Sequence, residues 1–227
     1  MLDSTPIQIT LFFILLFLIY FVSKLLLKSL GTLFYFLTHS HKKTIGLLAF
    51  LFLPGTIIHE LAHVIVAGMM LVESSDIEFM PEIREDGVKL GSAQIQKTDP
   101  LRRTIIGVAP VLVGLSLIIG ISWYITNSSG ISIWVWALMF YLIFIVSNTM
   151  FSSKKDMEGT LMVFAILFAI LIAFYYVGLL DFNTILSSGW GQTMVEVLKK
   201  ANLFLSLPLI IDLIILGFVK LSIKKIR

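Results

Sequence analysis

Between Arg103 and Lys154 the chain carries no charged side chain, and most residues of this stretch are apolar. A helix needs roughly 20 apolar residues to cross a bilayer, so the stretch is long enough for two crossings. The polar run Asn127-Ser128-Ser129-Gly130 lies near its middle and predicts the turn between them. Because 58% of the 227 residues are hydrophobic and only 14% are charged, the chain is predicted to be an integral membrane protein.

Further apolar runs predict the remaining crossings. They cover residues 7–27, 44–72, 159–180 and 202–221, which brings the expected total to about six transmembrane helices. Residues 30–37 are expected along the membrane interface, and residues 190–200 as a short interfacial helix or a helical connector. The predicted fold class is an α-helical polytopic membrane protein, with one domain over residues 1–227.

The distribution of charge predicts an orientation and excludes several functions. The loops after the second, fourth and sixth expected spans hold most of the 17 Lys and Arg residues, which predicts that both termini are cytoplasmic. The lysines between the first two spans favour the opposite orientation. The scattered net charge of +3 argues against a nucleic-acid partner. The absence of Cys excludes disulfides, thiol catalysis and thiolate metal sites.

The sizeable loop at residues 73–103 has the pattern of a β-hairpin. Ile77 alternates with polar neighbours before Asp86-Gly87, and alternation resumes at Val88. Asp-Gly between alternating segments is a strong hairpin signal, while Pro81 restricts its strand to an edge or a bulge. We therefore predict a small β-hairpin insertion between the second and third helices.

The second predicted span contains His59-Glu60-x-x-His63. Residues i and i+4 share one face of a helix, so both imidazoles can reach one metal ion. Glu60 is one position further round, where it can hold the attacking water and accept its proton. Inserting an ionisable group deep in a span costs about 2.5–3.5 kcal/mol on insertion scales. Three such groups within about one helical turn therefore indicate a functional site. The alternatives are a polar cluster satisfied by neighbouring helices, or a loop mistaken for a span.

Two histidines leave a hydrolytic zinc site incomplete, because such sites usually have three protein ligands and an open position for water. The chain has no Cys, and His39 and His41 lie outside the second predicted span. The third ligand is therefore expected to be a carboxylate, and the candidates are Asp156 and Asp212. Asp156 follows the fourth span on the side where the second span ends. Asp212 is near the middle of the sixth span, where it is also a candidate partner for a ligating His.

Three segments together resemble the site-2 protease family of intramembrane zinc metalloproteases. That family has a membrane-embedded H-E-x-x-H, matched at residues 59–63, and a later Asn-x-x-Pro…Asp-Gly string with the Asn eight residues before the Asp. Here Asn148 and Asp156 keep that interval, without the Pro after the Asn or the Gly after the Asp. Gly107-Val108-Ala109-Pro110 stands where the family has a small-residue turn. The resemblance covers about residues 44–160.

The resemblance implies the chemistry of the site. One Zn²⁺ per chain would be held by His59, His63 and Asp156, with Glu60 as the catalytic base. Asn148 would assist substrate binding or charge stabilisation. The implied activity is that of a zinc metalloendopeptidase which hydrolyses peptide bonds in or near transmembrane segments.

The expected location is the cell membrane of a prokaryote, and the expected partners are the lipid bilayer, a transmembrane protein or peptide substrate and a separate regulatory protein. No PDZ-like domain fits in the length. Membrane H-E-x-x-H proteases of the prenyl-protein-processing or heat-shock type are a second enzyme class, but they take a later Glu as ligand. The remaining alternative is a non-catalytic metal-binding or scaffold protein derived from such a protease.

Overall fold

The computed structural model describes residues 5–78, 82–84, 87–89, 92–96, 98–151, 166, 169–170, 173–174, 176–178 and 189–226. The chain forms helices α1 (Thr5–Thr38) and α2 (His41–Met69), then four strands, then helices α3 (Pro100–Asn127), α4 (Ile133–Thr149) and α7 (Gly189–Ile226). In the described part, α1, α2, α3 and α7 are long and apolar enough to cross a membrane, and α4 is a shorter apolar helix. This confirms a helical protein with several membrane-length helices.

The boundaries of the helices agree with the sequence in one region and differ in two. The uncharged stretch divides at its polar turn into α3 and α4, as predicted. Residues 30–37 continue α1 instead of forming an interfacial segment, because Leu30 is buried in the main core. Residues 190–200 are likewise the first part of α7, not a separate helix. The predicted span at 159–180 lies largely outside the described residues.

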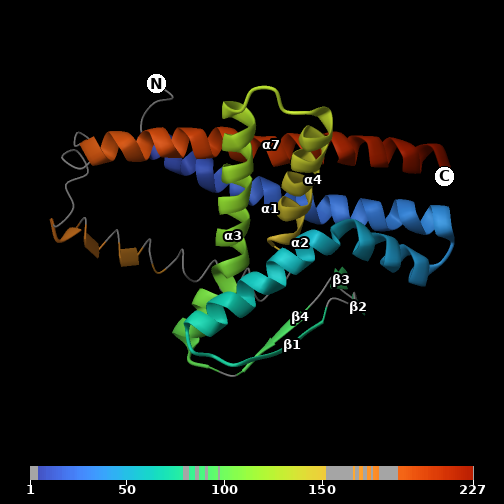
Figure 1. The fold of residues 1–227 in the computed structure, drawn as a ribbon, viewed down its shortest axis with the longest axis horizontal. Coiled ribbons are helices and arrows are strands. Elements are labelled where there is room, and N and C mark those ends of the chain that lie inside the picture. The colour runs from blue at the N-terminus through green and yellow to red at the C-terminus, as the bar shows by residue number, and fades with distance from the viewer. Residues whose placement is uncertain are drawn as a thin grey trace.

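Helices α1 and α7 lie side by side, and α3 and α4 cross them (Figure 1). Asn202 in the first half of α7 donates through Nδ2 to the backbone oxygen of Gln8 at 2.9 Å and to its Oε1 at 2.8 Å. The start of α1 therefore lies beside the first half of α7. Figure 1 shows that the two helices run in the same direction. The two cytoplasmic termini expected from the charge distribution stay a prediction, because most residues between α4 and α7 lie outside the described part of the chain.

Two glycines let α4 approach its neighbours closely. A Cβ atom on Gly55 of α2 would lie 2.6 Å from Thr149 Oγ1 and 2.9 Å from the backbone oxygen of Ile145. A Cβ atom on Gly114 of α3 would lie 2.8 Å from the Cβ of Met150. The end of α4 is therefore packed against both α2 and α3 through positions where only glycine fits.

The segment between α2 and α3 contains strands β1 (Ser74–Glu78), β2 (Glu82–Arg84), β3 (Gly87–Lys89) and β4 (Ser92–Ile95). Strand β1 pairs antiparallel with β4, and β2 pairs antiparallel with β3. Gly87 pairs with Arg84 as the first residue of β3, and Asp86 of the predicted turn lies outside the described residues. Both β1 and β4 contact α2, and the strands lie beside that helix in Figure 1. Pro81 lies outside the described residues.

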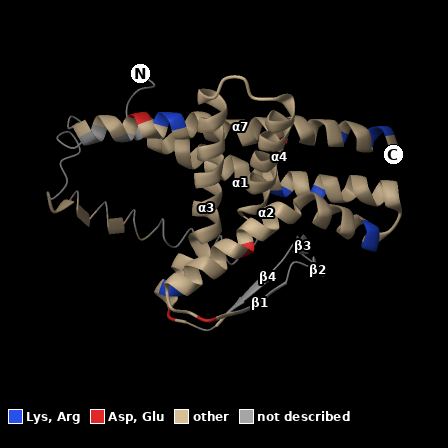
Figure 2. Ribbon diagram, viewed as in Figure 1, with Lys and Arg blue, Asp and Glu red and all other residues tan. Residues whose placement is uncertain are grey.

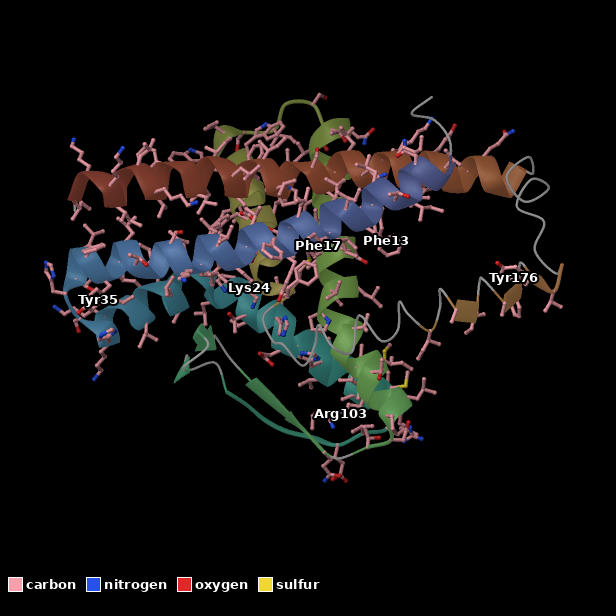
Figure 3. The ribbon with its side chains drawn as sticks, turned by 180° about the vertical axis from the view of Figure 1, so that it is seen from behind. Phe13, Phe17, Lys24, Tyr35, Arg103 and Tyr176 are labelled. Atoms are coloured by element: carbon pink, nitrogen blue, oxygen red, sulfur yellow. The ribbon has the colours of Figure 1, made fainter. Side chains whose placement is uncertain are left out.

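The surface of the helices is suited to lipid. Phe13 and Phe17 are exposed along α1, where Figure 3 labels them. Figure 2 shows that α4 carries no charged residue and that α3 carries charge only near its beginning. Exposed apolar side chains over a charge-free stretch are stable in a hydrocarbon solvent and unfavourable in water.

Candidate metal centre

The side chains of His59, Glu60 and His63 lie together in the second half of α2, and all three are buried. Their exposed fractions are 3%, 4% and 6%. The ring centroids of the two histidines are 4.9 Å apart, and their planes are nearly perpendicular at 85°. The helix therefore brings both imidazoles to one face, as the i, i+4 spacing predicted, and buried Glu60 directly follows His59 in the chain.

A bond to α3 orients one of these histidines. Nδ1 of His63 lies 2.9 Å from the backbone oxygen of Ile106. A carbonyl oxygen can only accept a hydrogen bond, so Nδ1 carries the proton in this contact and Nε2 is the nitrogen that keeps a lone pair. Metal-ligating histidines commonly have this arrangement, in which one ring nitrogen donates to a carbonyl and the other faces the metal.

The role of Ile106 could not be recognised from its residue type, because Ile106 is apolar and contacts His63 through its backbone oxygen. The predicted small-residue turn at residues 107–110 is also absent, since these residues are helical within α3. Residues 107–110 therefore lie in a helix that also carries the carbonyl contacted by His63, and not in a turn.

Helix α4 runs parallel to α2 and ends near the histidines. Tyr141 Oη donates to the backbone oxygen of Leu51 at 2.8 Å, and further along both helices Gly55 lies against Thr149. His59 is one turn beyond Gly55. Phe151, two residues after Thr149, packs its ring against Tyr20 of α1, with the ring centroids 5.7 Å apart. Asp156 itself lies outside the described residues.

Asn148 and Asp212 form a buried pair between α4 and α7. Nδ2 of Asn148 donates to Asp212 Oδ1 at 2.7 Å and to the backbone oxygen of Phe144 at 2.8 Å. The backbone oxygen of Asn148 also accepts from Ser23 Oγ of α1 at 3.3 Å. Asn148 and Asp212 have exposed fractions of 1% and 0%. Within the described chain, the side-chain oxygen of Asn148 and the second carboxylate oxygen of Asp212 accept no hydrogen bond.

The pairing of Asp212 bears on its two predicted roles. Among the described residues its hydrogen-bond partner is Asn148, so its expected role as the partner of a ligating His is not seen there. No group of three or more His, Asp or Glu side chains in the described part of the chain is placed to hold a metal ion. Asp212 therefore does not complete a metal site with His59 and His63 in this arrangement.

The donors that are present fit a zinc ion. Zinc takes imidazole nitrogen readily, and the tautomer of His63 leaves Nε2 as its ligating atom. The fold and the site together define a helical membrane protein with a buried His-Glu-His cluster. No protein-family model, curated protein or solved structure matches the chain.

Proposed function

We propose that the protein is an intramembrane zinc metalloprotease of the site-2 protease type. The observation that supports this most is the contact of His63 Nδ1 with the Ile106 oxygen, because it orients a buried histidine as a metal ligand requires. His59 and Glu60 beside it supply the second imidazole and the carboxylate that peptide hydrolysis needs.

The proposed third ligand is Asp156. Asp156 follows Phe151 by five positions in the sequence, and an extended chain covers at most ~3.6 Å per residue, so a chain of at most about 18 Å connects them. Asp212 is the weaker candidate, because its carboxylate is already bonded to Asn148. His59, His63 and Asp156 would hold the ion, which would polarise the scissile carbonyl and activate water.

The proton transfers and the binding of substrate would be carried out by side chains of the protein. Glu60 accepts a proton from the attacking water and delivers it to the departing amide nitrogen. Burial of the cluster excludes bulk water, which strengthens the electrostatic interactions made there. Nδ2 of Asn148 is committed to Phe144 and Asp212, so its side-chain oxygen is the atom left to accept an N–H from an extended substrate.

The proposed substrate is a transmembrane segment that has partly unwound, because the carbonyl groups of an intact helix are hydrogen-bonded and poorly accessible. Strands β1 and β4 form a two-stranded sheet beside α2, and each has an outer edge. An extended segment can add to such an edge through main-chain hydrogen bonds. The bilayer would deliver the substrate laterally, and a separate regulatory protein would supply selectivity.

The test compares the membrane proteomes of cells that express the wild-type chain or Glu60→Gln. Glu60 is not a proposed ligand, so the variant should hold about one zinc per chain and lose activity by ~10²–10⁴-fold. Its uncleaved substrate should accumulate in the membrane. Glu196→Gln is the matched control, since Glu196 is exposed on α7, and it should cleave normally.

Two outcomes would contradict the proposal. Cleavage by Glu60→Gln at the wild-type rate would refute the catalytic role of Glu60. Zinc binding by the wild-type chain without any difference between the two proteomes would instead favour the non-catalytic metal-binding or scaffold protein.

A further inference from the structure

Helix α3 contains a proline four residues after Ile106. In an α-helix the carbonyl of residue i accepts from the N–H of residue i+4, so the donor for Ile106 would be residue 110. That residue is Pro110, which has no N–H and lies inside the helix. The proline ring also clashes with the carbonyl of residue i−4, which tilts that carbonyl away from the helix axis. Pro110 therefore removes the helical partner of one particular oxygen.

The oxygen deprived of this partner is the one that His63 contacts. Ile106 has an exposed fraction of 1% and packs against Ala67 in the last turn of α2 and Val72 just after that helix. Because Ile106 is buried, its carbonyl has no access to bulk water as a hydrogen-bond donor. A buried carbonyl without a donor is unfavourable. Nδ1 of His63 lies 2.9 Å from this oxygen and is the donor that replaces the missing N–H.

The contact determines which nitrogen of His63 carries the proton. If residue 110 had an N–H, the Ile106 carbonyl would align with the helix and would be a weaker, less accessible acceptor for α2. The ring of His63 would then lose the bond that favours the proton on Nδ1. Either ring nitrogen could be protonated, and the lone pair on Nε2 would be present only part of the time.

We propose that Pro110 is a positioning residue for His63: by removing the helical donor to the Ile106 carbonyl, it directs that oxygen to Nδ1 and keeps Nε2 as the ligating nitrogen. The functional consequence rests on the proposed metal site, whereas the tautomer of His63 does not depend on it. Pro110 touches neither metal nor substrate in this proposal and acts through Ile106.

The experiment uses the full chain in detergent micelles, with ¹⁵N-labelled histidine and zinc removed. The chain has four His, and a His63→Gln sample identifies the signal of His63. In the wild-type protein His63 should be protonated at Nδ1, and in Pro110→Ala its signals should move towards a mixture of tautomers. Zinc affinity, measured by chelator competition, should fall by ~10–100-fold, the usual effect of losing a partner that orients a ligand.

Two further variants separate the missing N–H from other effects. Pro208→Ala removes a proline from inside α7 and should change neither the tautomer nor the zinc affinity. Pro110→lactic acid places an ester at residue 110, which lacks the N–H as proline does, and should keep both properties of the wild type. This variant also tests the inference if Pro110→Ala does not fold.

A wild-type tautomer and zinc affinity in Pro110→Ala would overturn the inference. So would an ester variant that folds but behaves like Pro110→Ala, because the effect would then come from the ring. If the tautomer shifts as expected but the wild-type chain binds no zinc, the inference on His63 stands and the proposed protease function fails.

Discussion

Gly55→Ala should separate α4 from α2 and so disturb the metal centre from one turn away. The new methyl group would lie 2.6 Å from Thr149 Oγ1, 3.0 Å from Thr149 Cγ2 and 2.9 Å from the backbone oxygen of Ile145. The hydroxyl of Thr149 cannot simply rotate away, because it is bonded to that same Ile145 oxygen at 2.8 Å. The backbone oxygen is part of a helix and cannot move alone.

The expected cost follows from these contacts. Overpacking a close contact costs about 1–3 kcal/mol, and loss of the Thr149 hydrogen bond adds about 1 kcal/mol. The better helix propensity of alanine returns about 0.5–1 kcal/mol. Gly55→Ala should therefore lower the free energy of unfolding by about 1–3.5 kcal/mol. Zinc occupancy should also fall, because α4 precedes Asp156 in the chain.

The assay is reversible unfolding in mixed micelles, together with zinc content per chain. Gly46→Ala and Gly68→Ala are matched controls on the same helix, since a Cβ atom at either position meets nothing within 4 Å. Both should be neutral or slightly stabilising. Adding Thr149→Ala to Gly55→Ala removes two of the three close contacts and should recover part of the lost stability.

If Gly55→Ala unfolded and bound zinc like the two control variants, a close contact at Gly55 would be refuted as a determinant of stability. If the double variant were no more stable than Gly55→Ala, the strain in Gly55→Ala would not come from Thr149.

The other predictions concern carboxylates and one amide. Asp156→Ala should lower zinc occupancy while Asp212→Ala retains most of it, and the reverse pattern would exchange their roles. Asn148→Ala should reduce cleavage with zinc content unchanged, and loss of zinc would assign Asn148 to the metal site instead. Asp99 caps α3, and its bond from the Arg102 N–H holds the pKa of its carboxyl below the usual value. The contribution of Asp99 to stability is therefore present at neutral pH and is lost as pH falls through that lowered pKa. The stability of Asp99→Asn should fall less steeply with acid than that of the wild type. An unchanged acid dependence would show that this cap does not contribute to it.

The sequence was sufficient for features that depend on neighbours along the chain. Long apolar runs predicted the membrane-length helices, because bilayer thickness sets their length. The polar turn before Ile133 separated α3 from α4, and the i, i+4 spacing put His59 and His63 on one face. Each of these is a property of local geometry, so no knowledge of packing was needed.

Features that depend on which helices touch were decided by the tertiary structure alone. Lipid tails are as apolar as leucine, so apolar side chains in a membrane do not specify their neighbours, and small residues and polar pairs do. Gly55 brings α4 against α2, and the Asn202–Gln8 bond holds the first half of α7 beside the start of α1. The Asn148–Asp212 pair and the bond from His63 to Ile106 arise in the same way, from atoms far apart in sequence that meet only when the helices pack.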